Sequence, residues 1–178
     1  MKNNRLLIAP VFIPHEGCPY RCVFCSQTDI TGSAFQADEE NVLSVLKTYL
    51  YPTLQSDKFS RREVAFYGGS FTGLSDERQE FLLSLIKPLV DDGRVDAIRV
   101  STHPLFINKK QLERLKAFGV ETVELGIQST NQEVLEKSGR PCSSADMLSA
   151  VSLIREYDLK LGLQLMLGLP GDNESRFE

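Results

Sequence analysis

The feature that most constrains the fold is a regular alternation of strand-like and helix-like segments along the 178-residue chain. Short apolar runs rich in β-branched residues alternate with longer segments in which apolar residues recur at helical spacing. This pattern indicates successive βαβ units, which build a parallel sheet with right-handed crossovers and give either an open doubly wound sheet or a barrel. The expected strands are 5–13, 63–69, 96–102, 120–129 and 160–168, and the expected helices are 38–50, 75–93, 108–119 and 143–159.

Prolines and charged residues refine the boundaries of these elements. Pro52 is expected to stop the first helix, because proline cannot continue the backbone hydrogen-bond pattern. Pro88 is expected to kink or shorten the second helix for the same reason. Arg61 and Arg62, which precede the second strand, are expected to form a solvated turn.

The end of the sequence suggests an incomplete fold. After the fifth strand, GLPGDNESRFE forms a turn and offers Asp172 or Asn173 as the cap of a new helix, and the sequence then stops. An unpaired parallel edge strand is a liability in a folded protein. We therefore expect residues 1–178 to form a single, C-terminally truncated domain.

The composition excludes several classes of protein. The net charge of −4, the pI near 5.3 and the hydrophobic content of 42% are ordinary for a globular protein. No apolar run is long enough to span a bilayer, and the N-terminus lacks the long apolar region of a signal peptide. We expect a cytoplasmic protein without a membrane partner. The mild acidity gives no support for a nucleic-acid-binding face, although a local basic patch is compatible with it.

Three of the four cysteines cluster in GCPYRCVFCSQ, at the spacing C-x3-C-x2-C. In a reducing compartment such a cluster indicates metal chemistry rather than disulfides. Cys18, Cys22 and Cys25 suit an iron–sulfur cluster with one iron left open. With His15 they also suit a structural Cys3His zinc site, and the loop alone leaves both interpretations open. The remote Cys142 is expected to be a structural thiol.

The other expected strands also end in small or polar residues. Ligands of parallel α/β folds bind at the carboxyl ends of the strands, so we expect all these turns to lie around one opening at that edge of the sheet. Gly68 and Gly69 permit a close backbone approach to a ligand. Because this pair lies one βα unit after the cysteine loop, the two features together predict a joint ligand site. The turns in question are YGGSFTG, STHP, ELGIQS and GLPGD.

These residues resemble the radical S-adenosylmethionine (radical SAM) superfamily. Its signature is C-x3-C-x2-C after the first barrel strand, with an aromatic residue before the third cysteine, a place that Phe24 occupies here. The segments VFIPHEGCPYRCVFCSQ…ITG, AFYGGSFTGL, VELGIQS and LMLGLPGD are similar to the branch that contains the radical SAM domain of the Elongator catalytic subunit and oxygen-independent coproporphyrinogen III oxidase-like proteins. The resemblance covers nearly the whole chain. It implies a partial (β/α)6 barrel, of which about five βα units are present.

The resemblance also implies the cofactors. A [4Fe–4S] cluster is expected on Cys18, Cys22 and Cys25, with S-adenosylmethionine bound to the fourth iron. The residues expected around S-adenosylmethionine are Gly68, Gly69 and Ser70 at the methionine amino group, Ser101 and Gln128 at the ribose or methionyl part, Phe24 and Gly168 near the adenine, and Glu124 from an inner strand position. A bulky residue at Gly69 is expected to block this ligand without disturbing the cysteine loop.

The implied activity is reductive cleavage of S-adenosylmethionine to a 5′-deoxyadenosyl radical, which abstracts hydrogen from a substrate. The electron is expected from an external one-electron reductant of the flavodoxin or ferredoxin type. The substrate is unidentified, and tRNA modification and tetrapyrrole chemistry are both open. Two alternatives stand beside this activity: a cluster-binding protein that is catalytically incomplete, and a zinc-stapled binding domain.

One segment departs from the family pattern. Relatives in this branch tend to have Arg-Pro-Asp after the third strand, whereas this chain has His103, Pro104 and Leu105. Replacing a guanidinium and a carboxylate by an imidazole and an aliphatic chain puts the usual charge network of this corner in doubt. A lone histidine before proline is expected to be structural.

Overall fold

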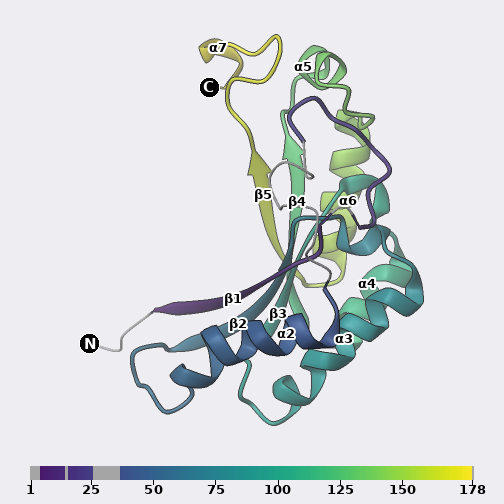
Figure 1. The fold of residues 1–178 in the computed structure, drawn as a ribbon. Helices are drawn as coiled ribbons and strands as arrows, with labels where there is room; N and C mark the ends of the chain where they lie inside the picture. The colour runs from purple at the N-terminus through teal and green to yellow at the C-terminus, as the bar shows by residue number, and fades with distance from the viewer. Residues whose placement is uncertain (1–4, 15, 26–36, 178) are drawn as a thin grey trace.

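The computed structural model describes residues 5–14, 16–25 and 37–177, and within them five parallel strands form one sheet. The strands lie in the order β1-β2-β3-β4-β5, so every crossover moves one step in the same direction (Figure 1). A doubly wound sheet would reverse direction at a switch point, so the described strands form part of a barrel wall. The strands are β1 (Leu6–Phe12), β2 (Arg61–Tyr67), β3 (Ala97–Thr102), β4 (Val120–Gln128) and β5 (Lys160–Leu165).

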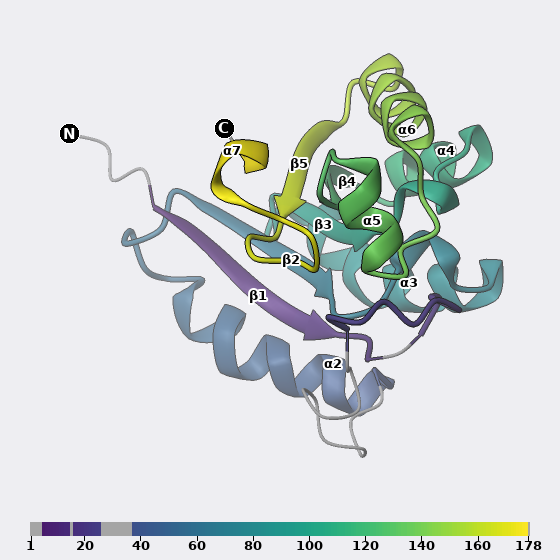
Figure 2. The same ribbon diagram turned by 90° about the horizontal axis from the view of Figure 1, so that it is seen from above.

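Helices α2, α3, α4 and α6 lie along the convex side of the sheet (Figure 2). The short helix α5 lies at the carboxyl end of β4 (Figure 1). No helix of the described residues is long and apolar enough to cross a membrane. This arrangement confirms the predicted partial barrel of βα units. The helices are α2 (Glu39–Val45), α3 (Asp76–Asp91), α4 (Lys109–Ala117), α5 (Gln132–Lys137), α6 (Ser144–Glu156) and α7 (Glu174–Phe177).

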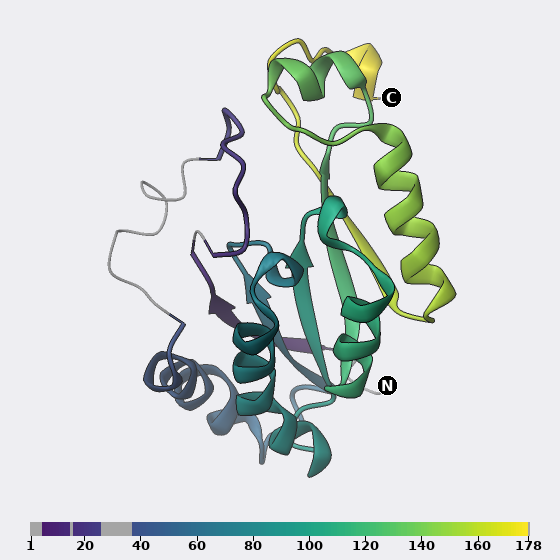
Figure 3. The same ribbon diagram turned by 90° about the vertical axis from the view of Figure 1, so that its right-hand side faces the viewer.

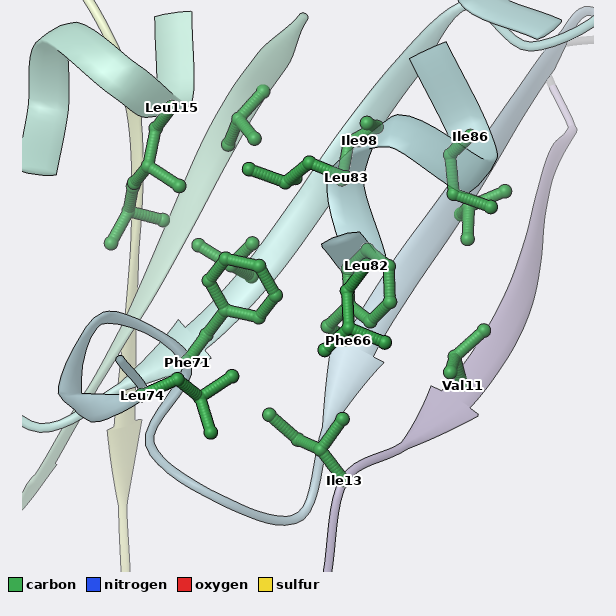
Figure 4. Packing of buried hydrophobic residues seen from close by; sticks show 14 of the residues in the cluster. Val11, Ile13, Phe66, Phe71, Leu74, Leu82, Leu83, Ile86, Ile98 and Leu115 are labelled. Atoms are coloured by element: carbon green, nitrogen blue, oxygen red, sulfur yellow. The ribbon is translucent and has the colours of Figure 1, made fainter. Parts of the chain in front are cut away.

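The hydrophobic core lies between the sheet and these helices (Figure 4). Alternate residues of each strand point toward it, as the period of two in a strand requires. Phe66 of β2 packs on Phe71 with 5.1 Å between the ring centroids, and Ile98 of β3 and Leu82 of α3 are also fully buried. Each such side chain contributes about 1.5–3 kcal/mol by leaving water. The core therefore fixes the position of every strand end.

The helix boundaries differ from expectation at both prolines. Pro88 does not shorten α3, which continues to Asp91. Pro52 does not stop the first helix either. The chain continues after α2 through a π-helical turn, Leu46–Leu50, and a 3-10 turn, Tyr51–Thr53, in which Pro52 occupies an early position that tolerates its missing N–H. Helix α5 was not expected, because its six residues are too few to show a helical period.

The concave face of the sheet carries charges, which the sequence pattern did not predict. Arg61 and Arg62 open β2 instead of forming a solvated turn. Arg61 Nε donates to Glu63 Oε1 over 2.6 Å, and Arg99 Nη2 donates to Glu63 Oε2 over 2.7 Å. Arg99 Nη1 reaches Glu124 Oε1 on β4 over 2.5 Å. We call Arg61, Glu63, Arg99 and Glu124 the charge ladder.

Glu63 is the centre of this ladder and is only 2% exposed. Burial alone would raise its pKa, but the hydrogen bonds from Arg61 and Arg99 outweigh that effect and hold the pKa below its usual value. A buried carboxylate is tolerated only when it is paired and hydrogen-bonded in this way. The ladder therefore ties β2, β3 and β4 together across the concave face.

Replacing Glu63 by glutamine tests the ladder. Glu63→Gln leaves two partly buried guanidiniums competing for a neutral amide, and we expect the free energy of unfolding to fall by about 3 kcal/mol. The estimate is at the low end for a broken buried pair because each arginine keeps a second carboxylate, Glu121 for Arg61 and Glu124 for Arg99. Urea unfolding measures this change. The matched control is Glu80→Gln, whose carboxylate pairs with Arg114 at the surface and is worth less than about 1 kcal/mol. Equal losses in the two variants would contradict the prediction.

Candidate functional site

A cavity of about 470 Å³ lies at the carboxyl ends of the strands. Its volume is in the range of small-molecule sites. Ten of the eleven predicted site residues line it, whereas Gly168 lies on the exposed turn after β5 and does not. The lining residues that the sequence singled out are Cys18, Cys22, Phe24, Cys25, Gly68, Gly69, Ser70, Ser101, Glu124 and Gln128.

The three clustered cysteines all line this cavity, and none of them forms a disulfide with a described residue. Their segment, purple in Figures 1 and 3, leaves the end of β1 and runs toward α5. Cys22 is buried, and Cys18 and Cys25 are half-buried. Burial raises the pKa of the Cys18 thiol, although the backbone N–H of Tyr20 acts in the opposite direction. A bound metal would supply the positive charge that such thiols need to be held as thiolates.

The arrangement of the thiols bears on the two metal interpretations. Among the described residues, no three His, Cys, Asp or Glu side chains are grouped closely enough to hold a single metal ion. A cluster spreads its irons apart, so its thiolates do not have to meet at one point. His15, which the zinc site would require, lies outside the described residues.

Glycines let the cysteine segment and the turn after β2 touch through their backbones. A Cβ at Gly69 would lie 2.4 Å from the carbonyl oxygen of Glu16 and 2.5 Å from that of Ile13. A Cβ at Gly17 would lie 2.2 Å from the carbonyl oxygen of Ser70. Ser70 N–H in turn donates to Glu16 O over 3.1 Å. A side chain at Gly69 would therefore push on the cysteine segment, which corrects the expectation that substitution there spares it.

Hydroxyl groups join this turn to the end of β3. Ser70 Oγ lies 2.9 Å from Thr102 Oγ1, and Thr72 Oγ1 lies 2.6 Å from the same atom. His103 N–H donates to Ser70 Oγ over 3.0 Å. The Ser70 hydroxyl group is thus used in hydrogen bonds within the cavity wall. The group of Ser70 that can contact a ligand is therefore its backbone carbonyl. Its carbonyl oxygen accepts from Gly73 N–H and keeps one lone pair for a second donor.

His103 is a neutral side chain in the cavity wall. It is 5% exposed and packs against Tyr20, with 5.1 Å between the ring centroids, and against Phe106. Nδ1 accepts a hydrogen bond from Leu105 N–H over 3.2 Å, so the ring proton is on Nε2. Nε2 has no partner among the described residues. Burial, and then the charge of Arg140, lower the pKa of His103 to about 3.

Arg140, which the sequence analysis did not consider, is the most notable residue of the site. It is 7% exposed and comes from the connection between α5 and α6. Nη2 donates to the carbonyl oxygen of Gly126 on β4, and Nη1 lies 3.9 Å from Cys22 Sγ. Nε is buried and has no hydrogen-bond partner among the described residues. Arg140 does not lie at the end of a strand, and the sequence signal for it is a lone arginine between Gly139 and Pro141.

The donors and acceptors of the cavity fit the implied cofactors. Two buried N–H groups without partners, on Arg140 and His103, suit an anionic group such as a carboxylate. Backbone carbonyls at Gly68 and Gly69 suit an ammonium group. The three thiols beside them suit a [4Fe–4S] cluster. A ligand with amino, carboxylate and apolar parts next to a cluster matches this wall.

The comparisons with known proteins agree with the geometry. The chain matches the Radical SAM superfamily over residues 12–178, and it belongs to that superfamily. It is 30% identical to the heme chaperone HemW of Haemophilus influenzae in an alignment that covers 90% of this chain and 43% of that protein. It is 22% identical to the tRNA uridine(34) acetyltransferase of Methanocaldococcus jannaschii in an alignment that covers 93% of this chain and 37% of that protein.

A solved structure shows the same fold. Elp3 of Methanocaldococcus infernus superposes with a TM-score of 0.68 and 18% identity, over 97% of this chain and 40% of that one. The chain thus spans about two-fifths of the length of these proteins. Membership of the superfamily supports iron–sulfur binding and S-adenosylmethionine-dependent radical chemistry as the class of activity.

Replacing Gly69 by alanine tests the backbone contact. Because the new methyl group would meet the carbonyl oxygens of Glu16 and Ile13, we expect Gly69→Ala to lower the free energy of unfolding by about 1–3 kcal/mol. We also expect it to lower the iron bound after reconstitution, because the cysteine segment is displaced. Urea unfolding and iron analysis measure the two effects. Gly93→Ala is the control, because a Cβ at Gly93 meets nothing within 4 Å. This variant should lose only the stability that a positive φ costs alanine, and it should bind as much iron as the wild type. Full iron loading in Gly69→Ala would contradict the prediction.

His103 predicts a pH dependence of stability. Its pKa is about 3 in the folded state and 6.5 ordinarily, so between these values the unfolded chain binds the extra proton and stability falls as the pH falls. We expect a loss of about 1.4 kcal/mol between about pH 7.5 and about pH 5.5. In His103→Asn, whose side-chain oxygen can accept from Leu105 N–H, this loss should disappear. Anaerobic urea titrations at both pH values measure it, and a pH-independent wild type would refute the prediction.

Proposed function

We propose that this chain is the core of a radical SAM enzyme, with a [4Fe–4S] cluster on Cys18, Cys22 and Cys25 and S-adenosylmethionine in the cavity beside them. The observation that carries the proposal is that three cysteines, the Gly68–Gly69 turn and a buried arginine line one cavity. When bound, this cofactor pair supplies one-electron cleavage of S-adenosylmethionine to a 5′-deoxyadenosyl radical, which removes a hydrogen atom from a substrate.

The residues of the chain bind and orient the ligand. The carbonyl oxygens of Gly68, Gly69 and Ser70 accept hydrogen bonds from the amino group. Arg140 Nε, which is buried and has no partner in the part of the chain that the structure describes, donates to the carboxylate. A guanidinium held by Gly126 O loses little freedom when it binds a carboxylate, so the ligand is positioned at low entropic cost.

Polar residues further along β3 and β4 meet the remaining part of the ligand. Ser101 and Gln128 line the cavity at the strand ends and suit the ribose or methionyl part. Glu124 is held by Arg99 through one oxygen, while Gln164 Nε2 lies 3.3 Å from the other. We assign Glu124 to accept a hydrogen bond from a ligand hydroxyl.

Apolar and aromatic side chains limit the access of water. Phe12, Tyr20, Phe24 and Tyr67 line the cavity between the polar groups. Excluding water strengthens the interactions of charged groups and protects reactive species from side reactions. We place Phe24 beside the adenine. Gly168 joins the site only through its backbone, if the turn after β5 closes on the bound ligand.

The substrate and the electron donor lie outside the chain. We propose an external one-electron reductant of the flavodoxin or ferredoxin type, since the described residues offer thiols for one cluster. The similar proteins act in different processes, as a heme chaperone and a tRNA acetyltransferase, so tRNA is one candidate substrate and a tetrapyrrole is another. We propose that the described core acts as a single domain.

The decisive experiment compares two cysteine substitutions in the anaerobically reconstituted protein. Cys22→Ala leaves two thiolates for the cluster, so we expect loss of iron and of 5′-deoxyadenosine formed from S-adenosylmethionine and dithionite. Cys142→Ala removes an equally buried thiol that does not line the cavity, and it should retain both. Iron analysis and mass spectrometry give the readouts.

Each outcome identifies a different class of protein. Iron without 5′-deoxyadenosine in the wild type would replace the enzyme by a cluster-binding protein. Bound zinc in a colourless wild type would support the zinc-stapled domain. An iron content of Cys22→Ala equal to that of the wild type would show that the cysteine segment does not bind the iron.

A further inference from the structure

Arg140 carries a charge that the described protein does not neutralise. Of the described residues that line the cavity, it is the one arginine or lysine. Both arginines of the charge ladder, Arg61 and Arg99, are paired with carboxylates, but no carboxylate oxygen of the described residues lies within 4.0 Å of Arg140. A buried cation without a partner is costly, so its place indicates an anionic group beside it.

The guanidinium is held against the cysteine segment by several backbone contacts. Val23 N–H donates to the carbonyl oxygen of Ser138 over 3.0 Å, which ties the segment between Cys22 and Cys25 to the end of α5. Arg140 N–H donates to Leu135 O over 2.9 Å, and Nη2 donates to Gly126 O. Nη1 is therefore left facing Cys22 Sγ, at 3.9 Å.

We infer that Arg140 tunes the iron–sulfur cluster, as a positioning residue that raises its reduction potential. This inference rests on the proposed function, because it requires a cluster on Cys22. Three thiolates and bridging sulfides give a cluster negative charge, and reduction adds one electron from the low-potential donor without forming or breaking a bond in the protein. A fixed cation against a ligand sulfur favours the more negative, reduced state, and hydrogen bonds to cluster sulfurs act in the same direction.

The test measures the reduction potential without S-adenosylmethionine, so that binding of this ligand does not enter. Wild type, Arg140→Gln and Arg140→Lys are reconstituted anaerobically and titrated with dithionite, with the reduced cluster followed by electron paramagnetic resonance. We expect Arg140→Gln to reduce the equilibrium constant for reduction at least tenfold, a shift of about 59 mV for one electron. Arg140→Lys keeps the charge but loses the planar fork, and it should fall between the two.

Arg21→Gln is the matched control. It removes one positive charge from the same cysteine segment, but its side chain is exposed and screened by water, so its potential should equal that of the wild type. Circular dichroism and urea unfolding verify that each variant is folded. A potential change of similar size in Arg21→Gln would show a general charge effect and overturn the inference.

The remaining outcomes separate this inference from the proposed function. A wild type that assembles no cluster refutes the proposed function itself. A wild type with a cluster and an Arg140→Gln variant of equal potential refutes the inference alone. If Arg140→Gln folds but holds no iron, the reduction potential of Arg140→Lys decides: a value below that of the wild type supports the inference, and an equal potential or absent iron overturns it.

Discussion

The site depends on one backbone contact that only glycine permits. The turn after β2 lies very close to the cysteine segment. A Cβ at Gly69 would overlap the carbonyl oxygen of Glu16, and a Cβ at Gly17 would overlap the carbonyl oxygen of Ser70. Gly73 makes a third such approach, since a Cβ there would lie 2.0 Å from Gly17 O. Because of these contacts, the thiols and the ligand-facing carbonyls belong to one packed unit. The arrangement of the three cysteines is therefore set by the same backbone contacts that shape the cavity.

The charge ladder gives this unit a rigid base. The convex face of the sheet is stabilised by apolar burial, but the concave face is stabilised by ion pairs that run from Arg61 through Glu63 and Arg99 to Glu124. Glu121 extends the ladder by pairing with Arg61 and with Lys160 of β5. Arginine suits this role because its fork bridges two carboxylates in fixed geometry. Arg99 of the ladder balances the negative charge of Glu124, so this carboxylate lines the cavity without being an unpaired charge.

The sequence predicted the five strands and four of the helices, because these follow from local patterns, and ten of the residues named from the cysteine motif and the family resemblance line one cavity. Hydrophobic periods predict the five strands, and the first residues of three expected helices, Asp38, Ser75 and Asn108, are N-caps whose side chains accept from the first turns of the helices. The charge ladder was missed because its members come from three strands and pair only after the sheet forms. Arg61 beside Arg62 has the local pattern of a turn, and Glu63 has the pattern of an exposed strand residue. Pairing between strands, not periodicity, decides where such residues lie.

Arg140 was missed for a related reason, and its position shows how the site is closed. Noncovalent contacts join the segments around the cavity in pairs: Tyr20 packs on His103, and hydrogen bonds connect Ser70 with Thr102 and Val23 with Ser138. The last of these contacts places the connection between α5 and α6 beside the thiols, although more than 110 residues separate Arg140 from Cys22. The guanidinium of Arg140 lies 3.9 Å from Cys22 Sγ, whereas the carboxylate of Glu124 is already paired with Arg99. Under the proposed function, a ligand whose carboxylate lies beside Arg140 neutralises this cation, whereas a ligand that places an apolar part there leaves a buried cation unpaired. Among the described lining residues, Arg140 is therefore the side chain that favours one orientation of the proposed ligand.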